Sequence, residues 1–254
     1  MGSQNKTGSL QTTIHNAVAT VQFGHPASNS FPRDLLNRLT AEINFLSTNS
    51  DVSIIILQSE GEKVFCSGAS FDELLEVQNE EQGTEFFSGF AHLINAMRNC
   101  SKLIIARVQG KAVGGGVGII AACDYVLATP ESAVKLSELA IGIGPFVIEP
   151  AVSRKIGKSA MTQMTLEAHE WKSADWALQN KLFSAVHTAN ELDNAVEAFA
   201  QKLSSYNPEA LTEMKKIIWE GTELWESLLI DRAAITGKLV LSDFTKNALL
   251  QFKK

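Results

Sequence analysis

The sequence predicts a mixed α/β fold in which strand, glycine turn and helix are repeated, followed by a helical C-terminal segment. Two glycine turns carry this prediction, because Cys66-Ser67-Gly68-Ala69 and Val113-Gly114-Gly115-Gly116 each follow a strand-like run and precede a helical pattern. After Trp171 the chain reads mainly as helices, and no linker rich in glycine, serine or proline precedes them. We therefore expect an α/β core over residues 1–190. Residues 191–254 should form a helical segment that packs on this core or on a neighbouring subunit.

Short apolar runs and helical spacing define the expected elements. Runs typical of buried strands cover residues 17–23, 53–57, 64–69, 103–108 and 124–128. Helices are expected from about residue 30 and over residues 71–75, 86–97, 117–123, 190–203 and 207–254. Pro32 lies near the start of the first helix, and Asn207 followed by Pro208 is a typical helix start. Residues 1–13 are polar, lack the apolar centre of a secretory signal, and are interpreted as a frayed leader.

The composition excludes several classes of protein. With 45% hydrophobic and 20% charged residues among 254, the chain is too apolar to be disordered. No apolar run reaches the roughly 18 residues of a membrane helix, so we expect no membrane partner. A net charge of −6 argues against a nucleic-acid partner, which would require a basic face. Cys66, Cys100 and Cys123 match no zinc-ligand spacing, so we expect no metal site and reduced thiols in a cytoplasmic protein.

The glycine turns themselves indicate a site. A glycine turn that opens a helix presents backbone N–H groups without acceptors, and the helix dipole adds partial positive charge there. Such a position binds an anion or the oxyanion that develops during a reaction. Two turns that face each other would supply two donors to one oxygen atom. The alternative is that the glycines only allow a helix to pack closely on a strand.

A dinucleotide site is a second alternative for the same segment. Gly116-Val117-Gly118-Ile119-Ile120-Ala121 matches the GxGxxA pattern of nicotinamide-dependent oxidoreductases and follows an apolar strand. The acid that should end the next strand is poorly placed, since Glu131 comes early and Glu138 follows a second apparent strand. A P-loop is excluded because no Gly-Lys-Ser or Gly-Lys-Thr follows the turn. Phe65, two residues before Ser67, excludes a nucleophile elbow.

Four longer segments are informative in combination. They are His25 to Ser30, Val64 to Phe71, Val108 to Gly116, and Leu136 to Leu139 with Gly142 and Pro145. Together with the pair Cys123-Asp124, they make the chain resemble the crotonase family, the enoyl-CoA hydratase/isomerase superfamily, from about Val18 to Phe252. The first segment resembles the early CoA-binding loop of that family. The second and third resemble its two oxyanion-hole turns, and the fourth resembles the segment that bears a catalytic glutamate.

The resemblance implies a fold and an assembly. The fold would be a crotonase-like (ClpP/crotonase) spiral of repeated ββα units over residues 1–190. Residues 191–254 would serve oligomerisation and cover the active site, within a homotrimer or a dimer of trimers. The substrate would be an acyl-CoA thioester of fatty-acid metabolism. No permanently bound cofactor is expected, because coenzyme A arrives as part of the substrate.

The resemblance also implies site residues. The N–H groups of Ala69 and Gly115 would hold the thioester oxygen while an enolate forms, and Glu138 would move a proton as general acid/base. The residues expected to bind the substrate or its CoA portion are Ala27, Ser28, Ser67, Gly68, Ser70, Phe71 and Gly114. Apart from the resemblance, a salt-bridged carboxylate at a strand end is the alternative interpretation of Glu138.

Two departures from the family pattern bear on the reaction. Hydratases with two glutamates carry the other glutamate where this chain has Gly118. The loop that is glycine-rich in the family is here Pro145-Phe146-Val147-Ile148-Glu149-Pro150. Glu149 is therefore either a displaced second acid or a solvated loop glutamate. The expected reaction is hydration or dehydration of an enoyl-CoA, of which methylglutaconyl-CoA is one example, or a double-bond shift that one glutamate can perform. A non-catalytic acyl-CoA-binding homologue is the remaining alternative.

Overall fold

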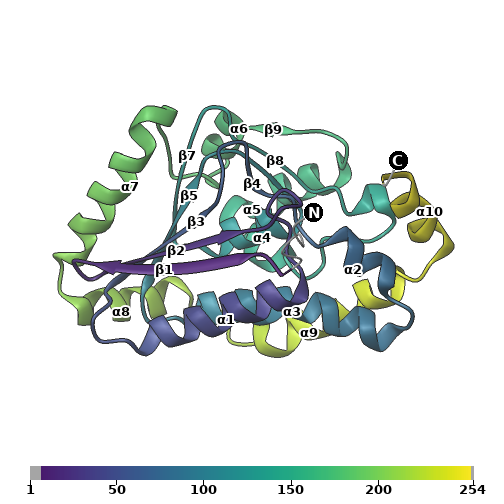
Figure 1. Cartoon of the computed structure of the whole chain (residues 1–254), viewed down its shortest axis with the longest axis horizontal. Coiled ribbons are helices and arrows are strands. Elements are labelled where there is room, and N and C mark those ends of the chain that lie inside the picture. Colours follow the sequence, from purple (N-terminus) through teal and green to yellow (C-terminus); the bar gives the residue numbers. More distant parts are fainter. Residues whose placement is uncertain (1–6, 253–254) are drawn as a thin grey trace, which may run out of the picture.

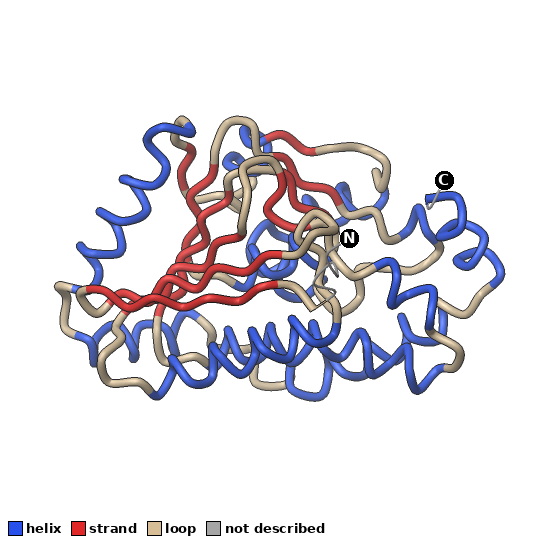
Figure 2. Tube along the Cα trace, in the orientation of Figure 1, coloured by secondary structure: helices blue, strands red, loops and turns tan. Residues whose placement is uncertain are grey.

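The computed structural model describes residues 7–252 and contains two sheets with helices packed around them (Figures 1 and 2). In spatial order, the six-stranded sheet consists of β1 (Ser9–His15), β2 (Val18–Gly24), β3 (Ile54–Ser59), β5 (Leu103–Val108), β7 (Tyr125–Ala128) and β10 (Ala185–Val186). The four-stranded sheet consists of β4 (Val64–Cys66), β6 (Lys111–Val113), β8 (Ala133–Lys135) and β9 (Lys172–Ser173). None of the helices within residues 7–252 has the length and apolar character needed to cross a membrane.

The helices follow the sequence as α1 (Arg33–Thr48), α2 (Phe71–Glu76), α3 (Glu80–Asn99), α4 (Gly115–Ala122), the 3₁₀ helix η1 (Leu139–Ile141), α5 (Glu149–Leu166), α6 (Ala174–Gln179), α7 (Ala189–Ser204), α8 (Pro208–Ile218), α9 (Trp225–Leu239) and α10 (Asp243–Phe252).

The central strands β2, β3, β5 and β7 are parallel neighbours. Helices cover both faces of such a sheet, so its strands are continuous apolar runs; the first four residues of β3, for example, are all buried. The predicted strands are confirmed to within one or two residues at their ends, except that β4 ends at Cys66 and the rest of its run forms the turn.

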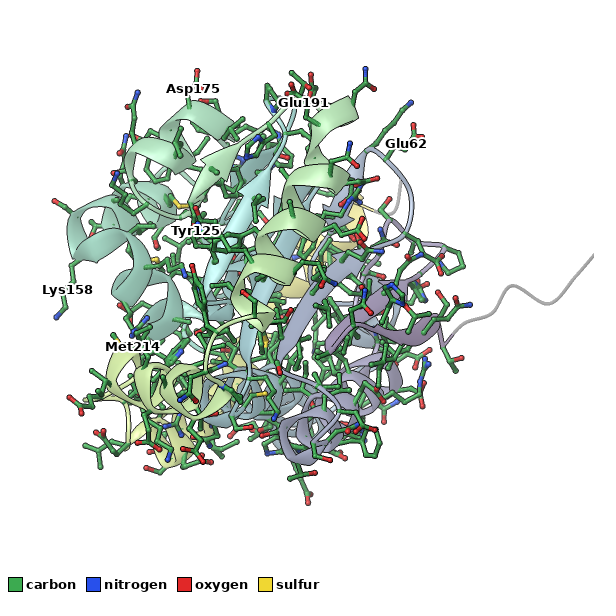
Figure 3. The ribbon with its side chains drawn as sticks, turned by 90° about the vertical axis from the view of Figure 1, so that its left-hand side faces the viewer. Glu62, Tyr125, Lys158, Asp175, Glu191 and Met214 are labelled. Atoms are coloured by element: carbon green, nitrogen blue, oxygen red, sulfur yellow. The ribbon has the colours of Figure 1, made fainter. Side chains whose placement is uncertain are left out.

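The two faces of the large sheet carry different helices. On one face α7 packs Leu192, Val196 and Ala200 against apolar residues of the sheet, and its Phe199 ring lies 4.4 Å from the ring of Tyr125. Figure 3 shows α7 in front of the sheet, beside the labelled Tyr125. The main hydrophobic core includes the buried residues of α1, α3 and α4 on the other side. In Figure 1, α1, α3 and α9 lie along the lower edge of the molecule.

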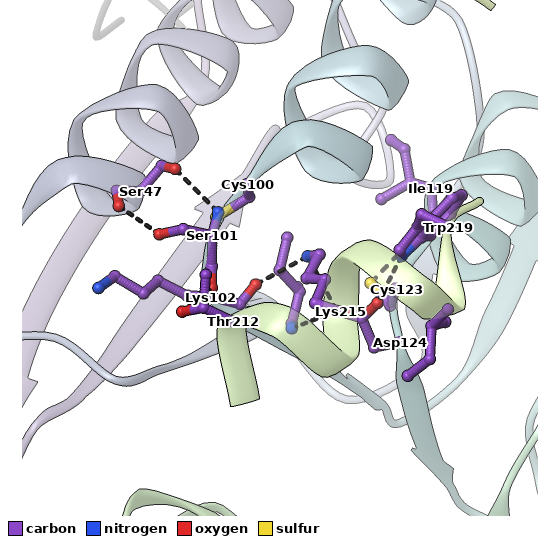
Figure 4. Close-up of polar contacts among 12 residues, drawn as sticks. Ser47, Cys100, Ser101, Lys102, Ile119, Cys123, Asp124, Thr212, Lys215 and Trp219 are labelled. Carbon is purple, nitrogen blue, oxygen red and sulfur yellow. Dashed lines mark hydrogen bonds and ion pairs between the residues drawn. The ribbon is translucent and has the colours of Figure 1, made fainter. Parts of the chain in front are cut away.

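The C-terminal helices pack on the core of their own chain. An added Cβ at Gly83 of α3 would lie only 2.7 Å from the carbonyl oxygen of Gly237, so α3 and α9 are in backbone contact. Helix α8 is tied to the core by Lys215, whose Nζ lies 3.0 Å from the Asp124 carboxylate (Figure 4). Helix α10 packs against η1 and α2.

The interpretation of residues 1–13 as a frayed leader is wrong for residues 9–13. These residues belong to β1, which pairs antiparallel with β2 from Ser9 opposite Gly24 to His15 opposite Val18. The strand lies at an edge of the sheet and is held by backbone hydrogen bonds to β2, so polar side chains are tolerated along its exposed side. Residues 1–6 lie outside the described residues.

Within residues 7–252 the ββα repeat is seen as β3-β4-α2 and β5-β6-α4, and again as β7-β8-η1, where a 3₁₀ helix replaces the α-helix. The first strand of each unit lies in the large sheet, where β3, β5 and β7 are neighbours. The second lies in the small sheet, where β4, β6 and β8 are parallel neighbours. The carboxyl ends of β4, β6 and β8 therefore meet at one edge.

Candidate active site

A cavity lies at the edge where β4, β6 and β8 end. The residues that follow these strands are Ser67-Gly68-Ala69, Gly114-Gly115 and Leu136-Ser137-Glu138, and all of them except Leu136 line the cavity. Its volume is about 590 Å³, counted with its open mouth. The fold thus brings Ala69, Gly115 and Glu138, which the sequence predicts to form the site, to one cavity.

The first turn is shaped by Gly68, which has a φ of +89°. An added Cβ there would lie 3.0 Å from the carbonyl oxygen of Val113 and 3.6 Å from the amide nitrogen of Gly115, so the two turns are in close contact. Phe31 receives a hydrogen bond from Ser70 N and donates one to Gly68 O, at 3.0 and 2.8 Å. The N–H of Ala69, between them, has no acceptor among residues 7–252.

The second turn is shaped by Gly114, which has a φ of +53° and precedes the first turn of α4. Its N–H donates to the carbonyl oxygen of Lys135, 2.9 Å away, which ties the turn to β8. Gly115 is the first residue of α4, and its N–H has no acceptor in the described part of the chain. The helix dipole places partial positive charge at this amide. Both turns therefore present a free donor beside the cavity.

Among the described residues that line this cavity, only Glu138 has an ionisable side chain. The residue as a whole keeps some exposure, but its Oε2 atom is enclosed and has no hydrogen-bond partner in the described structure. An added Cβ at Gly114 would lie 2.9 Å from Glu138 Oε1, so the carboxyl reaches the second turn only because position 114 is glycine. Burial raises the pKa of Glu138 to about 7, against the smaller effect of its own backbone N–H.

The alternative of a salt-bridged strand-end carboxylate is wrong for Glu138. No cation in the described residues pairs with its carboxyl. A carboxyl with a pKa near neutrality and an enclosed, unpaired oxygen is equipped both to accept and to return a proton.

An isoleucine occupies the place where a second carboxylate would need room. An added Cβ at Gly118 would lie 2.3 Å from Cγ2 and 2.6 Å from Cβ of Ile148. Ile148 itself lines the cavity, and its exposed fraction is 4%. The wall beside Gly118 is therefore apolar.

Glu149 lies on the far side of that wall. Its carboxylate forms an ion pair with Arg232 and accepts a hydrogen bond from Ser153 Oγ at 2.5 Å. It lines a neighbouring cavity together with Lys158 and Arg232, and it is absent from the residues around Glu138. The structure does not bring this candidate second acid to the cavity that contains Glu138.

The residues predicted to bind CoA fall into two groups. Ser67, Gly68, Phe71 and Gly114 line the cavity, whereas Ala27, Ser28 and Ser70 do not. Ala27 and Ser28 nevertheless contact the first turn, because Ser67 donates its N–H to Ser28 O at 3.1 Å and its hydroxyl to Ala27 O at 3.2 Å. Ser70 caps α2 by accepting from Glu73 N at 3.4 Å.

The apolar wall of the cavity was not predicted from the sequence. Its apolar wall consists of Leu74, Phe87, Phe90, Ile141, Ile143, Phe146, Val147 and Ile148, with Thr236 from α9. Helical spacing assigns Phe90 to an apolar face of α3 but does not show which part of that face borders a cavity. Thr236 comes from α9, and the proximity of α9 to the glycine turns depends on how α9 packs against α3.

The ββα spiral, with two free amides and a buried carboxyl at one edge, defines a protein of the crotonase fold class. The family model described as enoyl-CoA hydratase/isomerase matches residues 13–241, and the chain belongs to this family. It is similar to a short-chain-enoyl-CoA hydratase of Clostridium acetobutylicum, with 29% identity over 238 residues that cover 92% of this chain and 90% of the relative. It is also similar to a peroxisomal Δ3,5-Δ2,4-dienoyl-CoA isomerase of Arabidopsis thaliana, with 25% identity over 240 residues, 87% of this chain and 84% of the relative.

A solved structure supports the same fold. The crystal structure of an enoyl-CoA hydratase from Bacillus halodurans superposes with a TM-score of 0.88 and 22% identity, covering 95% of this chain and 99% of the other. The family match and the two relatives show that the protein is an enzyme of the enoyl-CoA hydratase/isomerase type, so the nicotinamide alternative is wrong. Gly116 and Gly118 of the GxGxxA match serve close packing, since Cβ atoms there would lie 2.7 Å from Cys66 Cβ and 2.3 Å from Ile148 Cγ2.

Proposed function

We propose that the enzyme shifts a double bond in an enoyl-CoA by a 1,3-proton transfer in which Glu138 acts alone. One observation carries this proposal: among the described residues that line the cavity, Glu138 has the single carboxyl, and apolar Ile148 fills the space beside Gly118. Hydration by the usual pair requires two carboxylates to position a water molecule. A double-bond shift requires one group that takes a proton from one carbon and returns it to another.

The proposed mechanism uses the two free amides. The N–H groups of Ala69 and Gly115 hold the thioester oxygen, and Glu138 removes a proton from C2 of a 3-enoyl-CoA. The electron pair of that C–H bond moves into a dienolate, whose negative charge rests on the oxygen held by both donors. Glu138 then returns the proton to C4, which leaves the double bond between C2 and C3. Losing one oxyanion donor costs about 100- to 1,000-fold in rate in well-studied enzymes.

The surroundings of Glu138 support this use. A carboxyl with a pKa of about 7 is near the optimum for a group that must both accept and donate a proton at neutral pH. Ala27, Ser28, Ser67, Ser70 and Phe71 would guide the CoA portion toward the two amides.

We also propose that the enzyme forms the homotrimer or dimer of trimers that the resemblance implies, and that it acts in the cytoplasm. The large apolar side chains of Leu166, Leu224 and Phe244, which are 72%, 80% and 66% exposed, are candidates for contacts between subunits.

Product analysis tests the proposed reaction. The purified protein is incubated separately with 3-hexenoyl-CoA and with crotonyl-CoA. The products are separated by chromatography, and their masses are determined by mass spectrometry. We expect 3-hexenoyl-CoA to become 2-hexenoyl-CoA without a change in mass, and crotonyl-CoA to gain little or no water. Efficient hydration of crotonyl-CoA with no isomerisation would contradict the proposal and favour the hydratase alternative.

Replacement of Glu138 tests the role of this residue. Glu138→Gln preserves the shape of the side chain but removes the base, so we expect isomerisation to fall by at least about 100-fold, while acyl-CoA still binds. Binding is measured by calorimetry with hexanoyl-CoA. A variant that retains the wild-type rate would rule out proton transfer by Glu138.

A further inference from the structure

The segment 144–148, here called the partition, separates two cavities. Gly144, Pro145 and Phe146 border both the cavity that contains Glu138 and the neighbouring cavity that contains Glu149. Val147 and Ile148 face only the first of them. Ile148 ends the partition against Gly118, and α5 begins at the next residue. The position of the partition therefore determines whether Ile148 stays packed against Gly118 and closes that side of the cavity.

One guanidinium group ties both the partition and the first residue of α5 to α9. Arg232 Nη1 forms an ion pair with Glu149, and it also donates a hydrogen bond to the carbonyl oxygen of Phe146 at 3.3 Å. The second oxygen of Glu149 accepts from Ser153 Oγ, one turn further along α5. Glu149 N donates to the carbonyl oxygen of Pro145 at 2.9 Å. These contacts fix both the middle of the partition and its junction with α5.

The ion pair is partly shielded from water. The side chains of Arg232 and Glu149 are 28% and 31% exposed. Burial alone would raise the pKa of Glu149, but the hydrogen bonds from Ser153 and Arg232 and the charges of Arg232 and Lys158 outweigh it and lower the pKa below its ordinary value. Glu149 is therefore charged at neutral pH, at the N-terminus of α5, where the helix dipole favours a negative charge.

We infer that Arg232 and Glu149 are positioning residues that hold the partition against Gly118 and so exclude water from the space beside Glu138. This inference rests on the proposed function, because exclusion of water matters most for an enzyme that must isomerise without hydrating. It gives Glu149 a role other than that of a second acid. It also links the C-terminal helix α9 to the choice between two reactions of one enolate-forming site.

Three variants test this inference through their products. Arg232→Met removes both tethers and Glu149→Gln removes the charge of the pair, while Glu226→Gln is the matched control. Glu226 also joins α9 to the core by an ion pair, with Arg98 of α3, but neither residue borders the partition. We expect Arg232→Met to lower the isomerisation kcat by about tenfold or more, since small misplacements at a reacting centre have such effects. The fraction of 3-hydroxyacyl-CoA among its products should rise at least severalfold, with a smaller rise for Glu149→Gln and none for the control.

Hydrogen–deuterium exchange supplies a readout that does not require activity. We expect peptides covering residues 144–152 to exchange at least severalfold faster in Arg232→Met than in Glu226→Gln, because the amides of Glu149 and Val152 depend on the partition. Unchanged exchange in this segment overturns the inference, as does an unchanged product ratio in an active enzyme. If the wild type is inactive on every enoyl-CoA tested, the proposed function is contradicted instead. The exchange rates then show by themselves whether Arg232 holds the partition in place. If Arg232→Met does not fold, both the product ratio and the exchange rates are measured on Glu149→Gln.

Discussion

Glu138 combines two properties that a carboxyl rarely has together. Its oxygen Oε2 is enclosed and has no hydrogen-bond partner among residues 7–252, and its pKa is raised to about 7 by burial. Enclosing an unpaired carboxyl destabilises the folded chain, because the charged form loses its hydration. Residues of this kind are concentrated at functional sites, where a raised pKa serves proton transfer.

Stability should therefore depend on pH through Glu138. The pKa is about 7 in the folded chain and near the ordinary 4.5 in the unfolded chain, so the unfolded chain releases this proton first as the pH rises. The stability contributed by Glu138 thus falls between about pH 4.5 and pH 7. Gln cannot ionise, so we expect Glu138→Gln to be more stable than the wild type by up to about 3 kcal/mol at pH 8 and by less than about 1 kcal/mol at pH 5.

Urea unfolding at the two pH values measures this difference. Glu197→Gln, an exposed glutamate on α7, is the control and should change stability little at either pH. An equal effect of Glu138→Gln at pH 5 and pH 8 would show that the folded chain does not raise the pKa.

The contact between Gly118 and Ile148 leads to a second prediction at the residue scale. Gly118→Ala places a Cβ 2.3 Å from Ile148 Cγ2, and such overpacking typically costs about 1–3 kcal/mol. Ile148→Ala removes the obstructing atom, so the double variant should be more stable than the sum of the single effects predicts. Urea unfolding of all four proteins measures this coupling, and strictly additive effects would contradict the contact.

At the scale of elements, the site depends on turns that follow adjacent strands. Gly68 and Gly114 both adopt positive φ, which allows each strand to turn abruptly into a helix. The amide after each glycine has no acceptor within the described part of the chain. The same geometry brings Glu138 to the second turn. The elements that carry the donors must in turn be held by the rest of the molecule.

Helix α8 illustrates how an element is held. Lys215 is 1% exposed, forms an ion pair with Asp124 at 3.0 Å and donates to Lys102 O at 2.7 Å. Asp124 follows α4 and also accepts from Trp219 Nε1 at 2.8 Å (Figure 4). Removing one partner of a buried pair typically costs about 3–5 kcal/mol. We expect Lys215→Met to lower the free energy of unfolding by an amount near that range.

The neighbouring lysine offers a matched control for this prediction. Lys216→Met alters an exposed ion pair with Glu213 and should change the free energy of unfolding by less than about 1 kcal/mol. Chemical denaturation compares the two variants with the wild type. Equal effects of the two substitutions would show that Lys215 does not anchor α8.

At the scale of the whole molecule, large apolar side chains on α5, α10 and the turn before α9 are mostly exposed in the described chain. For the proposed assembly we expect sedimentation equilibrium to give three or six times the 27.6 kDa of one chain. Substituting Phe244 with a charged residue should weaken that assembly, because a charge at an apolar interface must lose its hydration. A monomer at micromolar concentration would contradict the proposed trimer.

The sequence predicted the buried strands of the core better than it predicted the edge strand β1 and the residues that line the cavity. Strands such as β3 are continuous apolar runs, so their burial is visible in the residues themselves. Strand β1 was misinterpreted because an edge strand is held by backbone hydrogen bonds, which polar side chains do not reveal. Ala69, Gly115 and Glu138 were found through motifs, whereas Ile148 and Thr236 enter the cavity from segments without one.

The sequence alone determined the fold class and the two glycine turns, because strand periodicity and positive-φ glycines are local properties of the chain. It identified the candidate carboxyl only through the resemblance of its motifs to the family. Only the tertiary structure decided which carboxyl shares the cavity with the free amides. Glu138 and Glu149 are eleven positions apart, yet among the described residues the first borders the cavity without an ion-pair partner and the second pairs with Arg232 outside it. Burial and pairing depend on what other segments bring alongside, so they emerge only when α9 and the segment 144–148 are packed in place.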